Sequence, residues 1–100
     1  MADVRRAPQA EADLQSILAD LDQKNPAVAD RYAAQFAEKG QALARFPEIG
    51  RFRPEIAPNL RSTLVHPYVM FYRIVGNDGQ ILRILDGRMD LRRILQEDAG

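Results

Sequence analysis

The chain has 100 residues, of which 46% are hydrophobic and 28% are charged, a composition typical of a globular domain. This length predicts one domain with one core, spanning residues 1–100. Fourteen Lys and Arg residues balance fourteen Asp and Glu residues, which argues against a protein that binds nucleic acid by charge alone.

Several classes of site are excluded by the residues that the chain lacks. It has no cysteine and only one histidine, His66, so thiolate and multi-histidine metal sites are ruled out, and no phosphate-binding glycine loop is present. We therefore expect no metal and no cofactor. No apolar run reaches the length of a membrane span, and residues 1–6 lack the pattern of a signal peptide. We expect a cytoplasmic protein without membrane contact.

The first half of the chain predicts two amphipathic helices. Pro8 suits the first position of a helix, and four apolar residues then recur at helical spacing: Leu14, Ile17, Leu18 and Leu21. Asn25-Pro26 ends this helix and begins the next, with Asn25 as the N-cap. The second helix is expected to run to about Phe46, with an apolar stripe formed by Val28, Tyr32, Phe36, Gly40, Leu43 and Phe46. Together they form an antiparallel hairpin, and Gly40 is expected to let another backbone approach closely.

The second half changes to the period of strands after a loop at residues 47–58. Three short runs rich in β-branched and aromatic residues predict strands at Arg61–Val65, Tyr68–Val75 and Gln80–Leu85. The second run is apolar on both faces apart from one arginine, so we place it at the centre of the sheet. A short helix capped by Asp90 is expected to follow.

These elements predict an α+β fold: an N-terminal antiparallel helical hairpin packed on a small antiparallel β-sheet, with a short C-terminal helix.

Twelve of the fourteen cations are arginine, and three of these, Arg61, Arg73 and Arg83, lie within the predicted strands. A charge inside a sheet is costly unless it is paired or reaches solvent. An even-numbered hairpin loop would place Tyr72 opposite Arg83, with Arg73 on the other face, whereas a three-residue loop would oppose the two arginines. Acidic partners for Arg73 and Arg83 could be Asp86 and Asp90. Arg61 and the arginines after the last strand favour a functional surface instead.

No catalytic constellation accompanies the single histidine. His66 precedes a proline in a predicted turn, and neither Ser62 nor Thr63 lies in a nucleophile motif. We interpret His66 as a turn or packing residue and predict no catalytic residue.

Six segments in order resemble the ParE branch of the RelE/ParE toxins, over a region from about Val4 to Leu95. They are Ala10-Glu11-Ala12-Asp13-Leu14, Asn25-Pro26, Phe46-Pro47-Glu48-Ile49-Gly50, Leu60-Arg61-Ser62, Tyr68-Val69-Met70-Phe71-Tyr72-Arg73 and Ile81-Leu82-Arg83-Ile84-Leu85. The fold of that family is the one predicted above.

The resemblance implies the toxin of a type II toxin–antitoxin pair. Such a toxin is neutralised by a ParD-like antitoxin whose C-terminal segment wraps it, and the better-studied members poison DNA gyrase when freed. Operator DNA would be contacted only indirectly, through the antitoxin. A toxin of this kind binds its target and is not an enzyme.

Two alternatives remain within the resemblance. The first is a RelE-like ribosome-dependent mRNA endonuclease, in which Arg61 and Arg88 would occupy functional positions. Against it, the loop that carries catalytic lysines in RelE-like toxins holds only Arg51 and Arg53, which stay protonated near neutral pH. Asp86 would also repel phosphate. The second alternative is a non-toxic co-repressor partner of the antitoxin.

We predict two binding surfaces from these considerations. An antitoxin strand or amphipathic helix would dock along the helical hairpin and the sheet edge. On this chain, apolar side chains would anchor the antitoxin and arginines would pair with its acidic residues. These antitoxin-binding candidates are Leu18, Tyr32, Phe36, Arg61, Arg73 and Arg83. The target would be bound by the basic end of the chain, through Arg88, Arg92 and Arg93.

Overall fold

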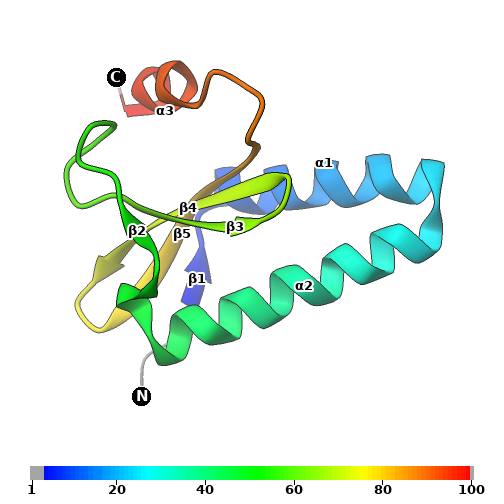
Figure 1. Ribbon diagram of the computed structural model, residues 1–100, viewed down its shortest axis with the longest axis horizontal. Helices are drawn as coiled ribbons and strands as arrows, with labels where there is room; N and C mark the ends of the chain where they lie inside the picture. The colour runs from blue at the N-terminus through cyan, green and yellow to red at the C-terminus, as the bar shows by residue number, and fades with distance from the viewer. Residues whose placement is uncertain (1–3, 100) are drawn as a thin grey trace.

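The computed structural model describes residues 4–99 and has nine elements (Figure 1). They are β1 (Val4–Arg6), α1 (Pro8–Lys24), α2 (Pro26–Arg45), the 3-10 helix η1 (Pro47–Ile49), β2 (Arg51–Phe52), β3 (Arg61–Val65), β4 (Tyr68–Val75), β5 (Asp78–Asp86) and α3 (Leu91–Ala99). The predicted helices and the three longer strands are confirmed. No helix within residues 4–99 is both long and apolar enough to cross a membrane.

The helical hairpin turns where the sequence predicts. The side chain of Asn25 accepts a hydrogen bond from the backbone N–H of Ala27 at 3.1 Å, which caps α2, and Pro26 occupies its first turn. Pro8 likewise begins α1, but its N-cap, Ala7, supplies no side-chain hydrogen bond. The backbone N–H of Ala7 bonds instead to the carbonyl of Ile81 at 2.8 Å, which fixes the start of α1 to the sheet.

The sheet has the strand order β1-β5-β4-β3-β2, so β4 is the central strand, as predicted. The pairs β2–β3, β3–β4 and β4–β5 are antiparallel, whereas β1 pairs with β5 in parallel. The sheet is therefore mostly antiparallel. The sequence analysis missed β1 and β2 because strands of three and two residues are too short to show an alternating pattern.

The β4–β5 hairpin corrects the predicted cross-strand pair. Its loop has two residues, with Val75 paired to Asp78, and Gly76 has a φ of 65°. The loop is Gly76-Asn77, and a β-bulge shifts the pairing of β4 with β5 between Phe71 and Tyr72. Arg83 consequently lies opposite Phe71 rather than Tyr72, so the predicted Tyr72–Arg83 pair is wrong.

Two hydrophobic clusters cover the two faces of the sheet, so the fold has three layers. The helical hairpin packs on one face, through Ala10, Phe36 and Leu43 against buried strand residues that include Met70 and Tyr72. The other face is covered by residues 56–60 and by α3, whose Leu95 packs with Phe71 and Leu85. In Figure 1, α1 and α2 extend together to the right of the sheet and α3 lies at the upper left.

Candidate partner-binding surfaces

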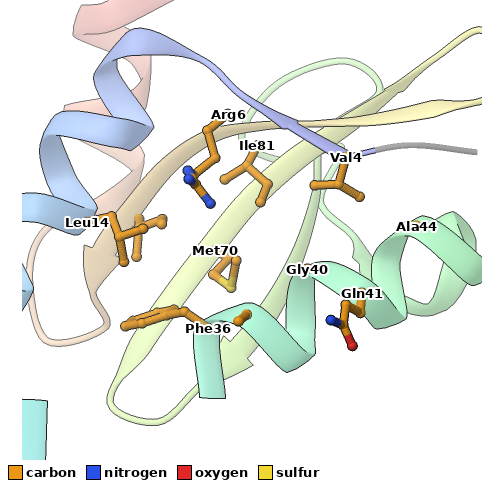
Figure 2. Close-up of a pocket in the computed structure, with 11 residues that line it drawn as sticks. Val4, Arg6, Leu14, Phe36, Gly40, Gln41, Ala44, Met70 and Ile81 are labelled. Carbon is orange, nitrogen blue, oxygen red and sulfur yellow. The ribbon is translucent and has the colours of Figure 1, made fainter. Parts of the chain in front are cut away.

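An open groove lies between α2 and the β1 edge of the sheet (Figure 2). It has a volume of about 300 Å³, and three of its lining residues on α2, Ala37, Gly40 and Ala44, are small residues at helical spacing. The remaining lining residues are Val4, Arg6, Leu14, Phe36, Gln41, Met70, Ile81 and Ile84. The lining is mainly apolar, so burial of an apolar side chain from a partner would be favourable here.

Gly40 lines this groove. A Cβ atom at position 40 would meet no heavy atom within 4 Å, so no backbone approaches this glycine and the predicted close approach is wrong. The space beside Gly40 belongs to the groove. A glycine inside a helix costs about 1 kcal/mol relative to alanine, and a packing neighbour does not explain that cost here.

The groove runs beside an edge strand. Because β1 is the last strand of the sheet, the backbone groups on its outer side pair with no strand within residues 4–99. An exposed edge of this kind can accept an extended peptide by strand addition, while its side chains enter the neighbouring groove. The arrangement is therefore suited to binding a segment of another polypeptide.

The three apolar candidates lie on the helical hairpin but differ in burial. Phe36 is 5% exposed and belongs to the core, where it forms part of the groove wall. Tyr32 is half-buried, packs edge-on against Tyr68 with ring centroids 5.6 Å apart, and donates a hydrogen bond to the carbonyl of His66 at 3.1 Å. Leu18 is half-buried on α1. Their role in antitoxin binding stays a prediction.

Arg83 forms the most buried ion pair described in the chain. Its Nε donates to Asp13 Oδ2 at 2.7 Å and its Nη2 donates to Asp13 Oδ1 at 3.0 Å, and both side chains are about 15% exposed or less. Asp13 Oδ2 also accepts the backbone N–H of Ile84 at 3.0 Å. Asp13 therefore ties α1 to β5, and the predicted acidic partners, Asp86 and Asp90, are wrong for Arg83.

Arg73 and Arg61 also make contacts within the chain. Arg73 is exposed and donates to the side-chain oxygen of Gln80 at 3.0 Å rather than to Asp86 or Asp90. Arg61 donates through Nη1 to the carbonyls of Glu48 and Gly50, at 3.2 and 3.1 Å. These two bonds hold the turn that leads into β2.

The target-binding candidates near the C-terminus are exposed, but carboxylates lie among them. Arg88 binds Asp86 through two side-chain nitrogens, at 3.0 and 2.6 Å. Arg92 donates to the carbonyl of Glu55 at 2.8 Å, which links α3 to the loop before β3. Arg93 lies 3.9 Å from Asp90, whose side chain caps α3 by accepting the N–H of Arg93 at 3.3 Å. This region is less basic than the arginines alone suggest.

The Asp86–Arg88 pair gives a direct test of the structure by titration. The guanidinium and backbone N–H of Arg88 hold the pKa of Asp86 at about 2, against an ordinary value of 3.8. We expect Arg88→Ala to raise this pKa part of the way to 3.8, since the backbone N–H at 2.9 Å remains. Because the folded-state pKa is lowered, the pair stabilises the fold above about pH 4, and this contribution is lost as the pH falls through about 2.

The measurement is an NMR titration of the Asp86 carboxyl carbon in wild type, Arg88→Ala and the control Arg93→Ala. The control removes an arginine that neighbours Asp90 instead, so its Asp86 should titrate as in wild type. An Asp86 that titrates near 3.8 in the wild-type protein would contradict the pairing.

The structure places His66 as the sequence analysis interpreted it, as an exposed turn residue between β3 and β4. Ser62 is buried on β3, where its hydroxyl accepts a hydrogen bond from Arg53 at 3.2 Å. Within the described part of the chain, no three His, Cys, Asp or Glu side chains gather in a metal-binding group.

The groove is the candidate binding feature that sequence reasoning missed. Its signal was present in the spacing of Ala37, Gly40 and Ala44, which places three small residues on one face of α2. This spacing alone does not predict a groove, because β1, which forms the opposite wall of the groove, was not predicted. The sequence analysis noted Gly40, but it predicted a neighbouring backbone beside this residue rather than a groove.

A helical hairpin packed on a five-stranded, mostly antiparallel sheet is a fold that this chain shares with solved structures of bacterial toxin–antitoxin systems. Among solved structures, the chain resembles the chromosomal ParDE system of P. aeruginosa with a TM-score of 0.73 and 28% identity, covering 86% of this chain and 96% of that one. It also resembles the toxin–antitoxin complex RelBE2 of Mycobacterium tuberculosis, with a TM-score of 0.61 and 26% identity, covering 85% and 90% of the two chains.

The sequence comparisons identify the family. A family model described as the ParE toxin of the type II toxin–antitoxin system parDE matches residues 4–91. Toxin ParE3 of Caulobacter vibrioides is 37% identical over 92 residues, which cover 91% of this chain and 92% of that toxin. The chain belongs to the ParE toxin family of type II toxin–antitoxin systems.

Proposed function

We propose that this toxin is neutralised by a ParD-like antitoxin and, when free, poisons DNA gyrase in the cytoplasm by binding rather than by catalysis. The observation that carries the antitoxin part is the open groove beside the β1 edge, together with solved structures of relatives in toxin–antitoxin systems. An extended segment of the antitoxin would pair with β1 and place apolar side chains in the groove beside Gly40.

Of the six candidate antitoxin contacts, only Phe36 lines this groove. Phe36 forms part of its wall, and Leu18 and Tyr32 would extend the contact along the helical hairpin. Arg61 and Arg73 would pair with acidic antitoxin residues at the sheet, with a smaller part for Arg83, whose guanidinium already binds Asp13. Operator DNA would be reached only through the antitoxin, with this chain as co-repressor.

The arginines of the sheet and tail support binding over RNA cleavage. An RNA-cleaving site needs a group that can take a proton from the 2′-hydroxyl and cations free to bind phosphate. Arg53 is held by Glu55 and Ser62, Arg61 by two backbone carbonyls, and Arg88 by Asp86. Their guanidinium groups stay protonated near neutral pH, so none of them can take that proton. We assign Arg88, Arg92 and Arg93 to contact with the gyrase protein.

The RelE-like endonuclease is the second candidate, favoured by the similarity to the RelBE2 complex. The two functions predict different first effects in cells. We expect expression of the toxin without its antitoxin to arrest growth, with thymidine incorporation falling before methionine incorporation, and co-expressed antitoxin to restore growth. Methionine incorporation that falls first would favour the ribosome as target. Normal growth despite folded, soluble toxin would favour the non-toxic co-repressor.

A further inference from the structure

The edge strand β1 turns the backbone groups of Arg6 outward. The backbone N–H of Ala7, directly after β1, bonds to the carbonyl of Ile81 on β5 at 2.8 Å. Successive residues of a strand direct their N–H and C=O groups to alternate sides, so those of Arg6 point away from β5. Within residues 4–99 no strand lies on that side. An extended segment added there would bond to Arg6 through both groups.

β1 also carries one arginine on each face of the sheet. The side chain of Arg6 lies on the face of the helical hairpin, where it lines the groove together with Val4 (Figure 2). The side chain of Arg5 points to the opposite face, because side chains alternate along a strand. Both arginines are exposed. A segment added to β1 would therefore have an arginine beside it on each face.

The guanidinium of Arg6 is only partly used within the chain. Its Nε donates to Glu11 Oε2, and the two side chains are 47% and 41% exposed. No hydrogen bond joins its Nη1 or Nη2 to another residue in the range 4–99. These two nitrogens would bind a carboxylate at the rim of the groove. Glu11 would repel the same carboxylate, so the two members of this ion pair would have opposite effects on binding.

On the other face of the sheet, Arg5 lies in a row with Gln80 and Arg73. Arg5 pairs with Gln80 on β5, and Gln80 pairs with Arg73 on β4. Neither arginine forms an ion pair with a residue that the structure describes, although Asp78 lies on the same face two residues before Gln80. This face therefore has two cations against one carboxylate next to the edge of the sheet, and Arg5 is the cation at the edge itself.

The occupant that fits this edge is an extended, acidic peptide segment. The outward N–H and C=O of Arg6 need a partner that both accepts and donates, as a peptide backbone does and a phosphate backbone does not. A second copy of this chain added through the same edge would bring its own arginines beside Arg5 and Arg6, and like charges across a strand pair are destabilising. Carboxylates on the added segment would instead pair with the arginines of both faces.

We propose that Arg5 and Arg6 select the antitoxin by binding two adjacent carboxylates in the segment that adds to β1. Neighbouring residues of the segment point to opposite faces, so one carboxylate lies beside Arg6 on the groove face and the next lies beside Arg5. The residue that follows this acidic pair, opposite Val4, places an apolar side chain in the groove. The inference rests on the proposed function, in which the antitoxin segment adds to β1, and it supplies the charge pattern of that segment.

The test measures the affinity of purified antitoxin for toxins with Arg5→Gln, Arg6→Gln or Glu11→Gln, by calorimetry. Arg51→Gln is the matched control. Arg51 is also an exposed arginine on an edge strand, β2, but at the opposite edge of the sheet, and it forms no ion pair with residues 4–99. Thermal unfolding of each free toxin shows that the variant is folded.

We expect Arg6→Gln to weaken binding about tenfold and Arg5→Gln about threefold, with Arg51→Gln within about twofold of wild type. Glu11→Gln should tighten binding about twofold or more, because it removes a repelling charge and releases the Nε of Arg6. The loss in Arg6→Gln should shrink at high salt. Full affinity in a folded Arg6→Gln toxin overturns the proposal. Equal weakening by Arg6→Gln and Glu11→Gln also overturns it, since the pair would then only hold β1 to α1.

Variants of the antitoxin test the same contact from the other side. Each Asp and Glu of its toxin-binding segment is changed in turn to Asn or Gln. One of these changes should cost about tenfold in affinity for the wild-type toxin but no more than about twofold for Arg6→Gln, because that toxin already lacks the contact. If no antitoxin carboxylate shows this dependence on Arg6, the pairing is wrong.

Failure of this inference is distinguishable from failure of the proposed docking at β1. Gly40→Phe, which fills the groove, is measured in the same assay. If Gly40→Phe weakens binding but neither arginine variant does, the groove stays the antitoxin site and only the charge pattern is overturned. If Gly40→Phe and both arginine variants all bind as tightly as wild type, the docking of the antitoxin at β1 is overturned as well.

Discussion

Replacing Asp13 with alanine is expected to lower the free energy of unfolding by about 3 kcal/mol. The substitution removes the carboxylate that binds two nitrogens of Arg83 and also accepts the backbone N–H of Ile84, next to the β-bulge. A partly buried guanidinium then loses the negative charge that balances it, and a backbone donor loses its acceptor. For a domain of this size, we expect the melting temperature to fall by about 15 °C.

The control for this prediction is Asp20→Ala. Asp20 lies on the same helix and is exposed, so its loss should change the free energy of unfolding by no more than about 0.5 kcal/mol. Both variants are measured by urea unfolding followed by circular dichroism. A loss below about 1 kcal/mol for Asp13→Ala would show that α1 is held to β5 by apolar packing alone.

Gly40→Phe is expected to weaken antitoxin binding by about 30-fold or more while the toxin stays folded. The new ring would occupy the groove beside α2, where position 40 has no neighbour within 4 Å of a Cβ atom. Phenylalanine also favours the helix more than glycine does, so the substitution does not weaken α2 itself. Affinity is measured by calorimetry with purified antitoxin, and co-expressed antitoxin should no longer restore growth fully.

Gly40→Ala separates the effect of the filled groove from the loss of glycine. It adds one methyl group in open space, so it should raise the free energy of unfolding by about 1 kcal/mol and change the affinity by no more than a few-fold. Wild-type affinity in Gly40→Phe would show that the antitoxin segment does not use this groove.

The helical hairpin and the three longer strands could be predicted because their signals are local. Asn25-Pro26 carries a cap and a helix start in adjacent residues, and the apolar run of β4 reports burial on both faces. β1 carries no such signal, since three residues are held in the sheet only by parallel pairing with β5, far along the chain. Because β1 was not predicted, the groove between β1 and α2 could not be predicted either.

The arginine contacts show a second limit of sequence reasoning. Candidate partners were sought close in sequence, at Asp86 and Asp90, whereas Arg83 pairs with Asp13 on α1. A one-residue bulge sets where Arg83 lies, and no local pattern predicts its position. Arg61 was noticed as a functional candidate, but its two bonds to the turn at Glu48 and Gly50 depend on β2 lying beside β3. Contacts of this kind require the register of the whole sheet.

A supercoiling assay tests the proposed target most directly. Toxin freed from its antitoxin is titrated into DNA gyrase, ATP and relaxed plasmid, and the products are separated on a gel. We predict loss of supercoiling with accumulation of cleaved DNA, and reversal of both effects by the antitoxin. Unchanged supercoiling with folded toxin that still arrests growth would contradict gyrase poisoning and direct the search to the ribosome.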